Sequence, residues 1–198
     1  MKYLCKWLLG LRGWKLTDTP LPVIDKAILI FAPHTSNWDF VTMVMAKFAL
    51  GIKVRYLGKH TLFYWPYGWF FRALGGMPVK RHEHNNVVGS VVELIENNDV
   101  IWLALAPEGT RSYTAYWKSG FYHIAERSSL PIIMFYLDIR TKSIGFSDLF
   151  EVSGNIEEDM AKFSQYYSEF EGYNPQQSSI IQTKKQYKLS GKSHADKN

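Results

Sequence analysis

Residues 27–50 read AILIFAPHTSNWDFVTMVMAKFAL, and this segment is the strongest indication of the fold class. Its first six residues, 27–32, are all apolar, as is typical of a strand that is buried on both faces of a sheet. The run ends at Pro33, and residues 40–50 then predict a helix that Gly51 closes. The stretch therefore predicts a buried strand, a turn that carries polar side chains, and a helix.

Short apolar runs and helical stretches continue to alternate along the rest of the chain. Further strands are predicted at residues 53–57, 77–80, 100–106 and 132–139. Further helices are predicted in part of residues 62–74, from Asn85 or Asn86 to residue 97, at 119–127 and at 157–170. Strands that alternate with helices predict an α/β fold, in which a mostly parallel central sheet is flanked by helices.

The chain has 198 residues, of which 46% are hydrophobic, and this is enough for one compact core. We therefore expect a single domain over residues 1–173. Residues 174–198 are rich in Gln, Ser and Lys and offer little apolar surface to bury, so they predict a polar, mobile tail. The only cysteine is Cys5, which excludes a disulfide framework within the chain.

Residues 2–15 predict an amphipathic helix at the N-terminus. Apolar residues recur there at helical spacing, with cations between them: Leu4, Trp7, Leu8 and Leu11, with Lys2, Lys6 and Arg12. Such a helix either lies in a membrane interface or packs against the core, and the sequence leaves both alternatives open. No apolar run reaches the roughly 20 residues of a membrane span, and we expect a peripheral protein at the cytoplasmic face of a membrane.

A second apolar segment, residues 63–71, contains seven aromatic side chains. Some of them are expected in the core. Because Trp and Tyr also favour the membrane–water interface, we expect the others to lie at an interface or to line a groove for an apolar ligand.

Positive charge is concentrated in the first half of the chain. Residues 1–90 carry 12 Lys and Arg against 4 Asp and Glu, whereas residues 91–198 carry 11 against 14. A basic half favours an anionic partner, which is a phosphate, a lipid headgroup or a nucleic acid. The chain contains no recognised nucleic-acid-binding motif, and the few lysines after residue 174 are not enough to bind a nucleic acid, so we expect no nucleic-acid partner.

The polar turn after the first strand contains His34 and, five residues later, Asp39. In a continuous helix these two side chains would not share a face, but a turn between strand and helix can fold Asp39 back onto the imidazole. The carboxylate would then fix the tautomer through one ring nitrogen and leave the other free to take a proton. That arrangement is the His–Asp half of a catalytic triad, without a protein nucleophile.

Two further loops carry groups that suit an anion. Pro107-Glu108-Gly109-Thr110-Arg111-Ser112 follows the predicted strand 100–106, and the carboxyl ends of strands are where α/β folds place their sites. Arg111 is a planar cation with several donors, which suits phosphate, and Thr110 adds a hydroxyl group. Residues 75–81, GGMPVKR, place Lys80 and Arg81 after a glycine-rich turn.

With these residues in this order, the chain resembles the glycerolipid acyltransferases of the 1-acylglycerol-3-phosphate (lysophosphatidate) type, in particular their short bacterial members. His34 and Asp39 match a His-x4-Asp box, and residues 107–112 are very close to the third box of that family. Residues 75–81 and 130–133 resemble its second and fourth boxes. The resemblance covers roughly residues 28–139, and the two strong boxes lie about 70 residues apart.

The resemblance implies an α/β enzyme that transfers a fatty acyl group from acyl-CoA or acyl carrier protein to the hydroxyl of a lysophosphatidate-like acceptor, in phospholipid biosynthesis or remodelling. It implies that His34 is the general base and that Asp39 orients it. The acceptor would be bound by residues of the other two boxes, namely Lys80, Arg81, Glu108, Gly109, Thr110 and Arg111, with Glu108 shaping the site.

A thioester is already activated, so this chemistry requires no Ser or Cys nucleophile, no metal and no cofactor other than the thioester co-substrate. Two alternatives stay open. The first is an acyltransferase for another lysolipid acceptor, since the sequence does not identify the acceptor, the donor or the acyl length. The second is a catalytically silent lipid-binding protein, against which the intact His34 and Asp39 argue.

Overall fold

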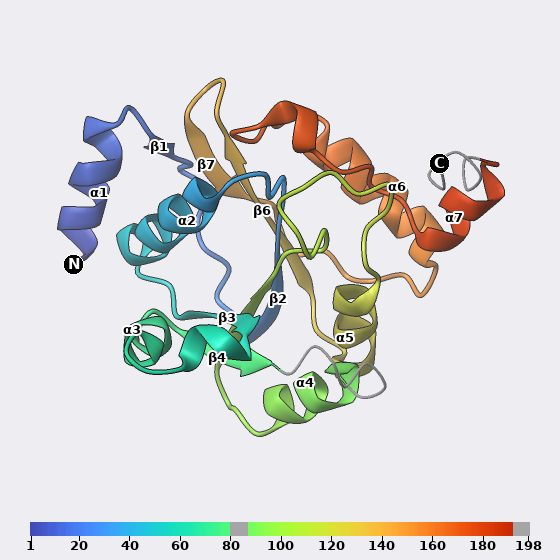
Figure 1. The fold of residues 1–198 in the computed structure, drawn as a ribbon, viewed down its shortest axis with the longest axis horizontal. Coiled ribbons are helices and arrows are strands. Elements are labelled where there is room, and N and C mark those ends of the chain that lie inside the picture. Colours follow the sequence, from blue (N-terminus) through green and yellow to red (C-terminus); the bar gives the residue numbers. More distant parts are fainter. Residues whose placement is uncertain (80–86, 192–198) are drawn as a thin grey trace.

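The computed structural model describes residues 1–79 and 87–191, and within them one mixed sheet forms the centre of the molecule (Figure 1). Its strands are β1 (Lys15–Leu16), β2 (Lys26–Phe31), β3 (Val54–Lys59), β4 (Gly76–Val79), β5 (Ile101–Leu105), β6 (Ile132–Asp138) and β7 (Ser143–Phe146). They lie in the order β1-β7-β6-β2-β5-β3-β4, and every neighbouring pair is parallel except β6 with β7. The predicted α/β fold with a mostly parallel sheet is confirmed.

Helices cover both faces of this sheet (Figure 1). The longer ones are α1 (Lys2–Leu11), α2 (Asn37–Leu50), α4 (Val87–Glu96), α5 (Gly120–Ser128) and α6 (Ile156–Tyr167). Shorter ones are η1 (His60–Phe63), α3 (Gly68–Ala73), η2 (Pro175–Gln177) and α7 (Lys184–Leu189). Buried side chains of α1 and α2 join one apolar core, and those of α4, α5 and α6 join a second core on the opposite face.

The central strand β2 shows why residues 27–32 are continuously apolar. Ile28 and Ile30 belong to the core on the α4–α6 side, whereas Leu29 and Phe31 belong to the core on the α1–α2 side. Because successive side chains of a strand point to opposite faces, a strand covered on both faces needs apolar residues at every position. The strand therefore holds the loop that follows it, with His34, at a fixed place in the molecule.

β6 corresponds to the predicted strand 132–139, but β7, which forms a hairpin with it, and the short strand β1 were not among the predicted elements. β7 runs antiparallel to β6 after a turn in which Lys142 has a φ of 51°, and β1 pairs with β7 over two residues. Two residues are too few to produce a recognisable alternation of apolar and polar side chains. These strands extend the sheet beyond β6, on the side away from β5.

The expectation of a polar, mobile tail from residue 174 differs from what the structure describes. Between residue 174 and residue 191 the chain forms η2 and α7, and Thr183 is buried. Hydrogen bonds hold this segment, since the N–H of Ile180 donates to Thr114 O and the N–H of Trp117 donates to Gln182 O, and Ile181 packs against the apolar core on the α4–α6 side. Packing therefore continues past the predicted boundary at residue 173.

The N-terminal helix α1 is present, and it both packs against the protein and exposes apolar side chains. Cys5 and Leu9 are buried next to α2, whereas a separate stripe is exposed to solvent, namely Tyr3, Leu4, Trp7, Leu8 and Leu11. Among the described residues, no helix is both long enough and apolar enough to span a bilayer.

Candidate active site

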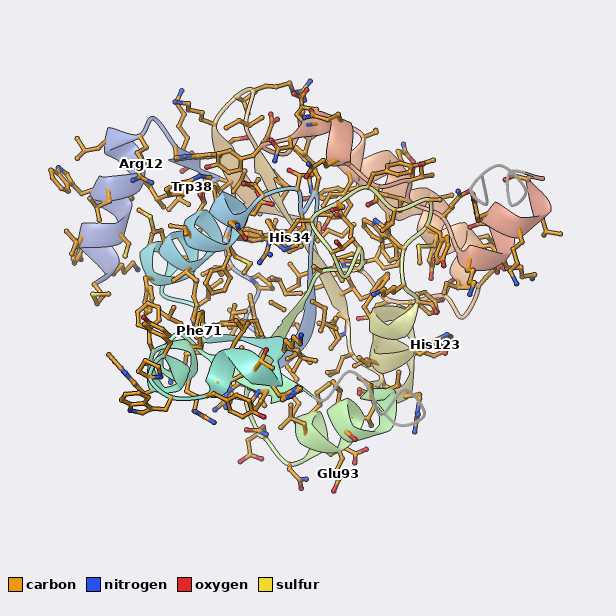
Figure 2. The ribbon with its side chains drawn as sticks, in the orientation of Figure 1. Arg12, His34, Trp38, Phe71, Glu93 and His123 are labelled. Atoms are coloured by element: carbon orange, nitrogen blue, oxygen red, sulfur yellow. The ribbon has the colours of Figure 1, made fainter. Side chains whose placement is uncertain are left out.

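Two loops that leave neighbouring strands form the candidate site. β2 and β5 are paired in parallel with Ile30 opposite Leu105, so their carboxyl ends lie side by side. His34 follows β2 and Glu108 follows β5, and the two loops meet where the backbone N–H of His34 donates to Oε1 of Glu108 over 3.1 Å. Figure 2 shows His34 near the centre of the molecule, beside the start of α2. The sheet thus brings together two boxes that are about 70 residues apart in the sequence.

Asp39 folds back onto the loop because it is part of the cap of α2. Ser36 is the N-cap residue and its hydroxyl group accepts from the N–H of Trp38 over 3.2 Å. In return, Oδ2 of Asp39 accepts from the N–H groups of Thr35 and Ser36, over 2.6 and 2.7 Å. A capping box of this kind satisfies N–H groups that a helix start leaves without partners. The cap holds Asp39, which is 0% exposed, in one position.

The imidazole of His34 lies between this carboxylate and the solvent. Its Nδ1 is 3.2 Å from Oδ2 of Asp39, and the His34 side chain is 16% exposed. Although the two atoms are close, Nδ1 makes no hydrogen bond in this orientation of the ring. The ring packs edge-on against Phe31, with the ring centroids 5.5 Å apart. With Nδ1 facing Asp39, Nε2 is the ring nitrogen on the side away from this carboxylate.

Glu108 is a buried acid, which the sequence did not indicate. It is 1% exposed. Burial raises the pKa of Glu108 to about 8, and the Asp39 carboxylate adds to this increase, while the His34 N–H and the Ser179 hydroxyl group lower the pKa. At neutral pH the carboxyl group is therefore mainly neutral, and its observed contact is with the backbone of His34.

This pKa predicts a pH dependence of stability. The folded protein keeps the Glu108 proton up to a pH of about 8, whereas an unfolded chain releases it near pH 4.5. The free energy of unfolding is therefore expected to decrease as the pH rises from about 4.5 to about 8. The slope from one such group is at most ~1.4 kcal/mol per pH unit. Urea unfolding of the wild type and of Glu108→Gln at several pH values measures it. The free energy of unfolding of the wild type, relative to that of Glu108→Gln, is expected to decrease as the pH rises. If the two free energies change in parallel with pH, the raised pKa of Glu108 is wrong.

The loop with Gly109, Thr110 and Arg111 turns away from the sheet at Gly109. Gly109 has a φ of 66°, which favours glycine, and the Thr110 hydroxyl group accepts from the N–H of Ser112 over 3.3 Å. The side chain of Arg111 is exposed. Lys118 was not predicted, yet its Nζ would lie 2.7 Å from a Cβ placed on Gly109, so a second cation borders this loop.

Lys80 and Arg81, the two predicted cations of the second box, lie outside the described residues. Three polar residues that the sequence did not single out do contact the site, namely Thr35, Asn174 and Gln177. Within residues 1–79 and 87–191, no group of three or more His, Cys, Asp or Glu side chains could hold a metal ion.

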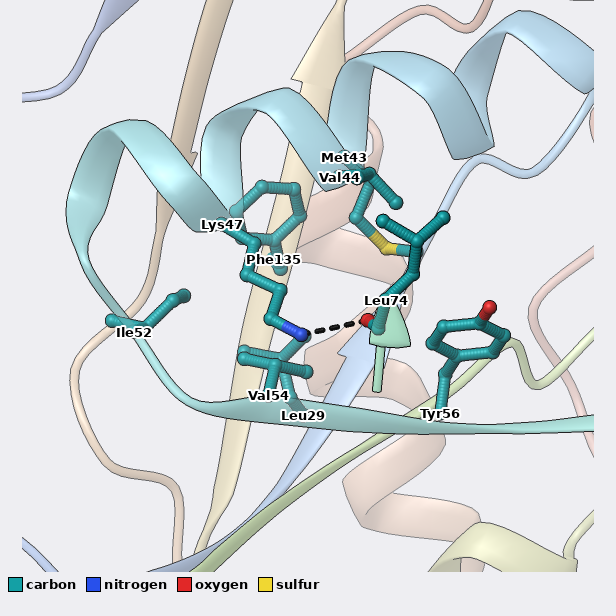
Figure 3. A pocket seen from close by; sticks show the side chains of 9 residues that line it. All are labelled: Leu29, Met43, Val44, Lys47, Ile52, Val54, Tyr56, Leu74 and Phe135. Atoms are coloured by element: carbon teal, nitrogen blue, oxygen red, sulfur yellow. Dashed lines mark hydrogen bonds between the residues drawn. The ribbon is translucent and has the colours of Figure 1, made fainter. Parts of the chain in front are cut away.

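A small apolar pocket lies beneath α2, on the face of the sheet that carries Phe31 (Figure 3). It is lined by Leu29, Met43, Val44, Lys47, Ile52, Val54, Tyr56, Leu74 and Phe135. Lys47 reaches across it and donates to Leu74 O over 2.8 Å. Phe135 packs against Phe31 with the centroids 5.9 Å apart, so two rings connect the pocket to His34.

Comparison with known proteins identifies the family to which this site belongs. A family model described as Acyltransferase matches residues 16–137, which include β2, His34, Asp39 and the loop of Arg111. The chain belongs to the acyltransferase family. The membership confirms the predicted resemblance.

Two members of the acyltransferase family are similar to this chain. A protein of Arabidopsis thaliana named "Probable 1-acyl-sn-glycerol-3-phosphate acyltransferase 5" is 32% identical over an alignment of 129 residues, which covers 62% of this chain and 34% of that relative. The chain thus spans about a third of its length. The crystal structure of the 1-acyl-sn-glycerophosphate (LPA) acyltransferase PlsC from Thermotoga maritima matches with a TM-score of 0.59 and 16% identity, over 83% of this chain and 73% of that one. This second likeness concerns the fold.

Proposed function

We propose that the protein is an O-acyltransferase that transfers a fatty acyl group from a thioester to the hydroxyl group of a lysophosphatidate-like acceptor. The observation that carries this proposal is the position of His34, with Nδ1 beside the buried Asp39 and the opposite side of the ring toward solvent. The names of the similar acyltransferases point to the same class of acceptor.

In the proposed reaction, Nε2 of His34 takes the proton of the acceptor hydroxyl group while the oxygen of that hydroxyl group attacks the thioester carbonyl carbon. Asp39, whose Oδ2 lies 3.2 Å from Nδ1, orients the imidazole and stabilises the imidazolium that forms. The bond from acyl carbon to oxygen forms, the bond to sulfur breaks, and the thiol leaves with a proton. General-base catalysis of this kind contributes ~10²–10⁴-fold.

The acyl chain is proposed to lie on the Phe31 side of the sheet, toward the apolar pocket behind Phe135. The acceptor phosphate is proposed to lie near Arg111 and Lys118, together with Lys80 and Arg81 of the second box. Arg111 and Lys118 belong to or border the loop of Gly109, whose neighbour Glu108 contacts the backbone of His34. The donor is proposed to be acyl-CoA or acyl carrier protein.

Release of free thiol from acyl-CoA, measured with and without each of a panel of lysolipids, tests this function. Lysophosphatidate is expected to support release, and lysophosphatidylcholine and monoacylglycerol to support it less. A better rate with lysophosphatidylcholine would favour another lysolipid acceptor, and thioester binding without release would favour a silent lipid-binding protein.

Arg111→Ala is expected to raise the KM for lysophosphatidate by about tenfold or more and to leave the KM for the thioester nearly unchanged. The reason is that a guanidinium–phosphate contact is charge-assisted and is lost with the side chain. Arg127→Ala, at the end of α5, is the matched control for loss of one exposed arginine. Equal acceptor kinetics in both variants would refute the phosphate assignment.

We also propose that the protein acts at the surface of an anionic membrane, on the cytoplasmic face. The exposed apolar stripe of α1 is accompanied by Lys2 and Lys6, and a second apolar surface is exposed around η1 and α3, namely Leu62, Tyr64, Trp65, Tyr67, Trp69 and Phe70. Phe63, in contrast, is buried in the core. Apolar and aromatic side chains next to cations favour the interface of an anionic bilayer.

The double substitution of Trp7 and Leu11 by Glu is expected to lower the fraction bound to phosphatidylglycerol vesicles by about tenfold or more, because each apolar side chain contributes ~1.5–3 kcal/mol when it is buried. Vesicle sedimentation measures this fraction, and added salt should also lower it. Leu189→Glu on α7, at the other end of the molecule, is the control for one exposed leucine (Figure 1). Unchanged sedimentation of the double variant would show that α1 does not bind the membrane.

A further inference from the structure

We propose that residues 172–182, hereafter the strap, fix the position of the His34 loop relative to the Arg111 loop. We also propose that Thr35, Asn174 and Gln177 are positioning residues of the site. The strap follows α6 and leads to α7 (Figure 1). It lies beyond residue 137, where the match to the family model ends. The role in catalysis rests on the proposed function, whereas the contacts themselves do not.

At its first end the strap binds Thr35, the residue next to His34. The backbone N–H of Asn174 donates to Thr35 Oγ1 over 3.1 Å, and Nδ2 of Asn174 donates to Thr35 O over 2.8 Å. Gly172 lies so close that a Cβ there would be 2.6 Å from Thr35 Oγ1. Thr35 is 1% exposed, and its own N–H donates to Asp39. One buried residue thus joins the strap to the carboxylate that faces His34.

Farther along, one side chain of the strap connects the two loops. The amide nitrogen of Gln177, oriented toward the two carbonyl groups beside it, donates to Thr35 O over 3.0 Å and to Arg111 O over 2.7 Å. A carbonyl oxygen has two lone pairs, so Thr35 O can accept from both Asn174 and Gln177. Through this amide, a displacement of the Arg111 loop displaces the backbone beside His34.

At its second end the strap fixes the rest of the loop that follows Arg111. Ser179 Oγ accepts from the N–H and from the hydroxyl group of Thr114, over 3.1 and 2.9 Å. Nε2 of Gln182 donates to Ala115 O over 2.7 Å. Residues 106–118 form no helix or strand, so these bonds to the strap supply the order that secondary structure would otherwise provide.

The consequence is kinetic, because a displacement of about 1 Å in a catalytic group can cost ~10²-fold in rate. Gln177→Met keeps the length of the side chain and removes both donations. The neighbouring Gln176 is exposed, so Gln176→Met is a matched control. Thr35→Val removes the oxygen that accepts from Asn174, and Thr35→Ser keeps it.

The test compares these variants in steady-state kinetics with acyl-CoA and lysophosphatidate, with melting temperatures measured alongside. We expect kcat to fall ~10–100-fold in Gln177→Met and Thr35→Val, with the KM for acyl-CoA unchanged and the protein still folded. Gln176→Met and Thr35→Ser should retain near wild-type rates. If Gln177→Met and Gln176→Met have the same kcat, the proposal is overturned.

Amide hydrogen exchange separates this proposal from the proposed function. In Gln177→Met, and not in Gln176→Met, exchange in residues 33–39 and 108–117 is expected to become about tenfold faster or more. If the wild type transfers acyl groups to no acceptor, the proposed function fails, and exchange alone decides whether the strap holds the two loops. Unchanged exchange overturns the strap, and faster exchange with an unchanged kcat overturns its role in positioning.

Discussion

Replacing His34 by alanine is expected to abolish acyl transfer, with a loss of ~10²–10⁴-fold, while the protein stays folded. The imidazole is partly exposed and its Nδ1 makes no hydrogen bond in the structure as described, so its removal takes away little of the packing. Besides Asp39, the loops of the site contain the carboxyl group of Glu108, which is buried and contacts the backbone N–H of His34. It is not placed to take over the proton from an acceptor on the other side of the ring.

The matched control for this variant is His123→Ala. His123 lies on α5, its side chain is 50% exposed, and Figure 2 shows it well away from His34. Acceptor-dependent thiol release should therefore be near normal in His123→Ala and lost in His34→Ala, with similar circular dichroism spectra. If a folded His34→Ala protein keeps most of the wild-type rate, the proposed mechanism is wrong and the alternative of a catalytically silent lipid-binding protein is favoured.

Replacing Asp39 by alanine is expected to impair both stability and catalysis. The N–H groups of Thr35 and Ser36 would lose their acceptor, and a buried donor without a partner costs ~1–3 kcal/mol, so the expected loss of unfolding free energy is ~2–6 kcal/mol. Asp39→Asn keeps an oxygen that can accept and should cost less stability. Both variants should lose ~10²–10⁴-fold in kcat, because neither can stabilise the imidazolium of His34.

Asp159→Ala separates the two effects. Asp159 is also 0% exposed and accepts from a backbone N–H, that of Ser153, over 2.7 Å, but it lies on α6 and has no contact with His34. It should lower the melting temperature and leave the kcat of the folded protein unchanged. If Asp39→Asn likewise alters only the melting temperature, Asp39 is a structural cap and not a partner of the catalytic histidine.

The parts of the molecule that were predictable from the sequence are the strands that are buried on both faces, because burial requires an apolar side chain at every position. Residues 27–31 and 101–105 are apolar throughout because helices cover both faces of β2 and β5, and the parallel pairing of these strands brings His34 and Glu108 together. The position of Asp39 was also predictable, because a turn between strand and helix leaves few places for its side chain.

The strap and the burial of Glu108 could not be predicted in the same way. The strap is held by Asn174, Gln177 and Ser179 through hydrogen bonds, and polar residues in such contacts look the same in a sequence as those of a solvated tail. Glu108 is buried by segments distant in the sequence, so nothing local distinguishes it from an exposed carboxylate. Pairs of polar groups leave no periodic pattern, whereas apolar faces do.

The most direct test of His34 as the catalytic base measures transfer of a labelled acyl group to the acceptor. Isotope-labelled acyl-CoA and lysophosphatidate are incubated with the wild type, His34→Ala and His123→Ala, and the labelled diacyl product is measured by mass spectrometry. We predict labelled phosphatidate with the wild type and His123→Ala, and only the uncatalysed background with His34→Ala. Equal amounts of product with folded His34→Ala and the wild type would contradict the central claim that His34 activates the acceptor.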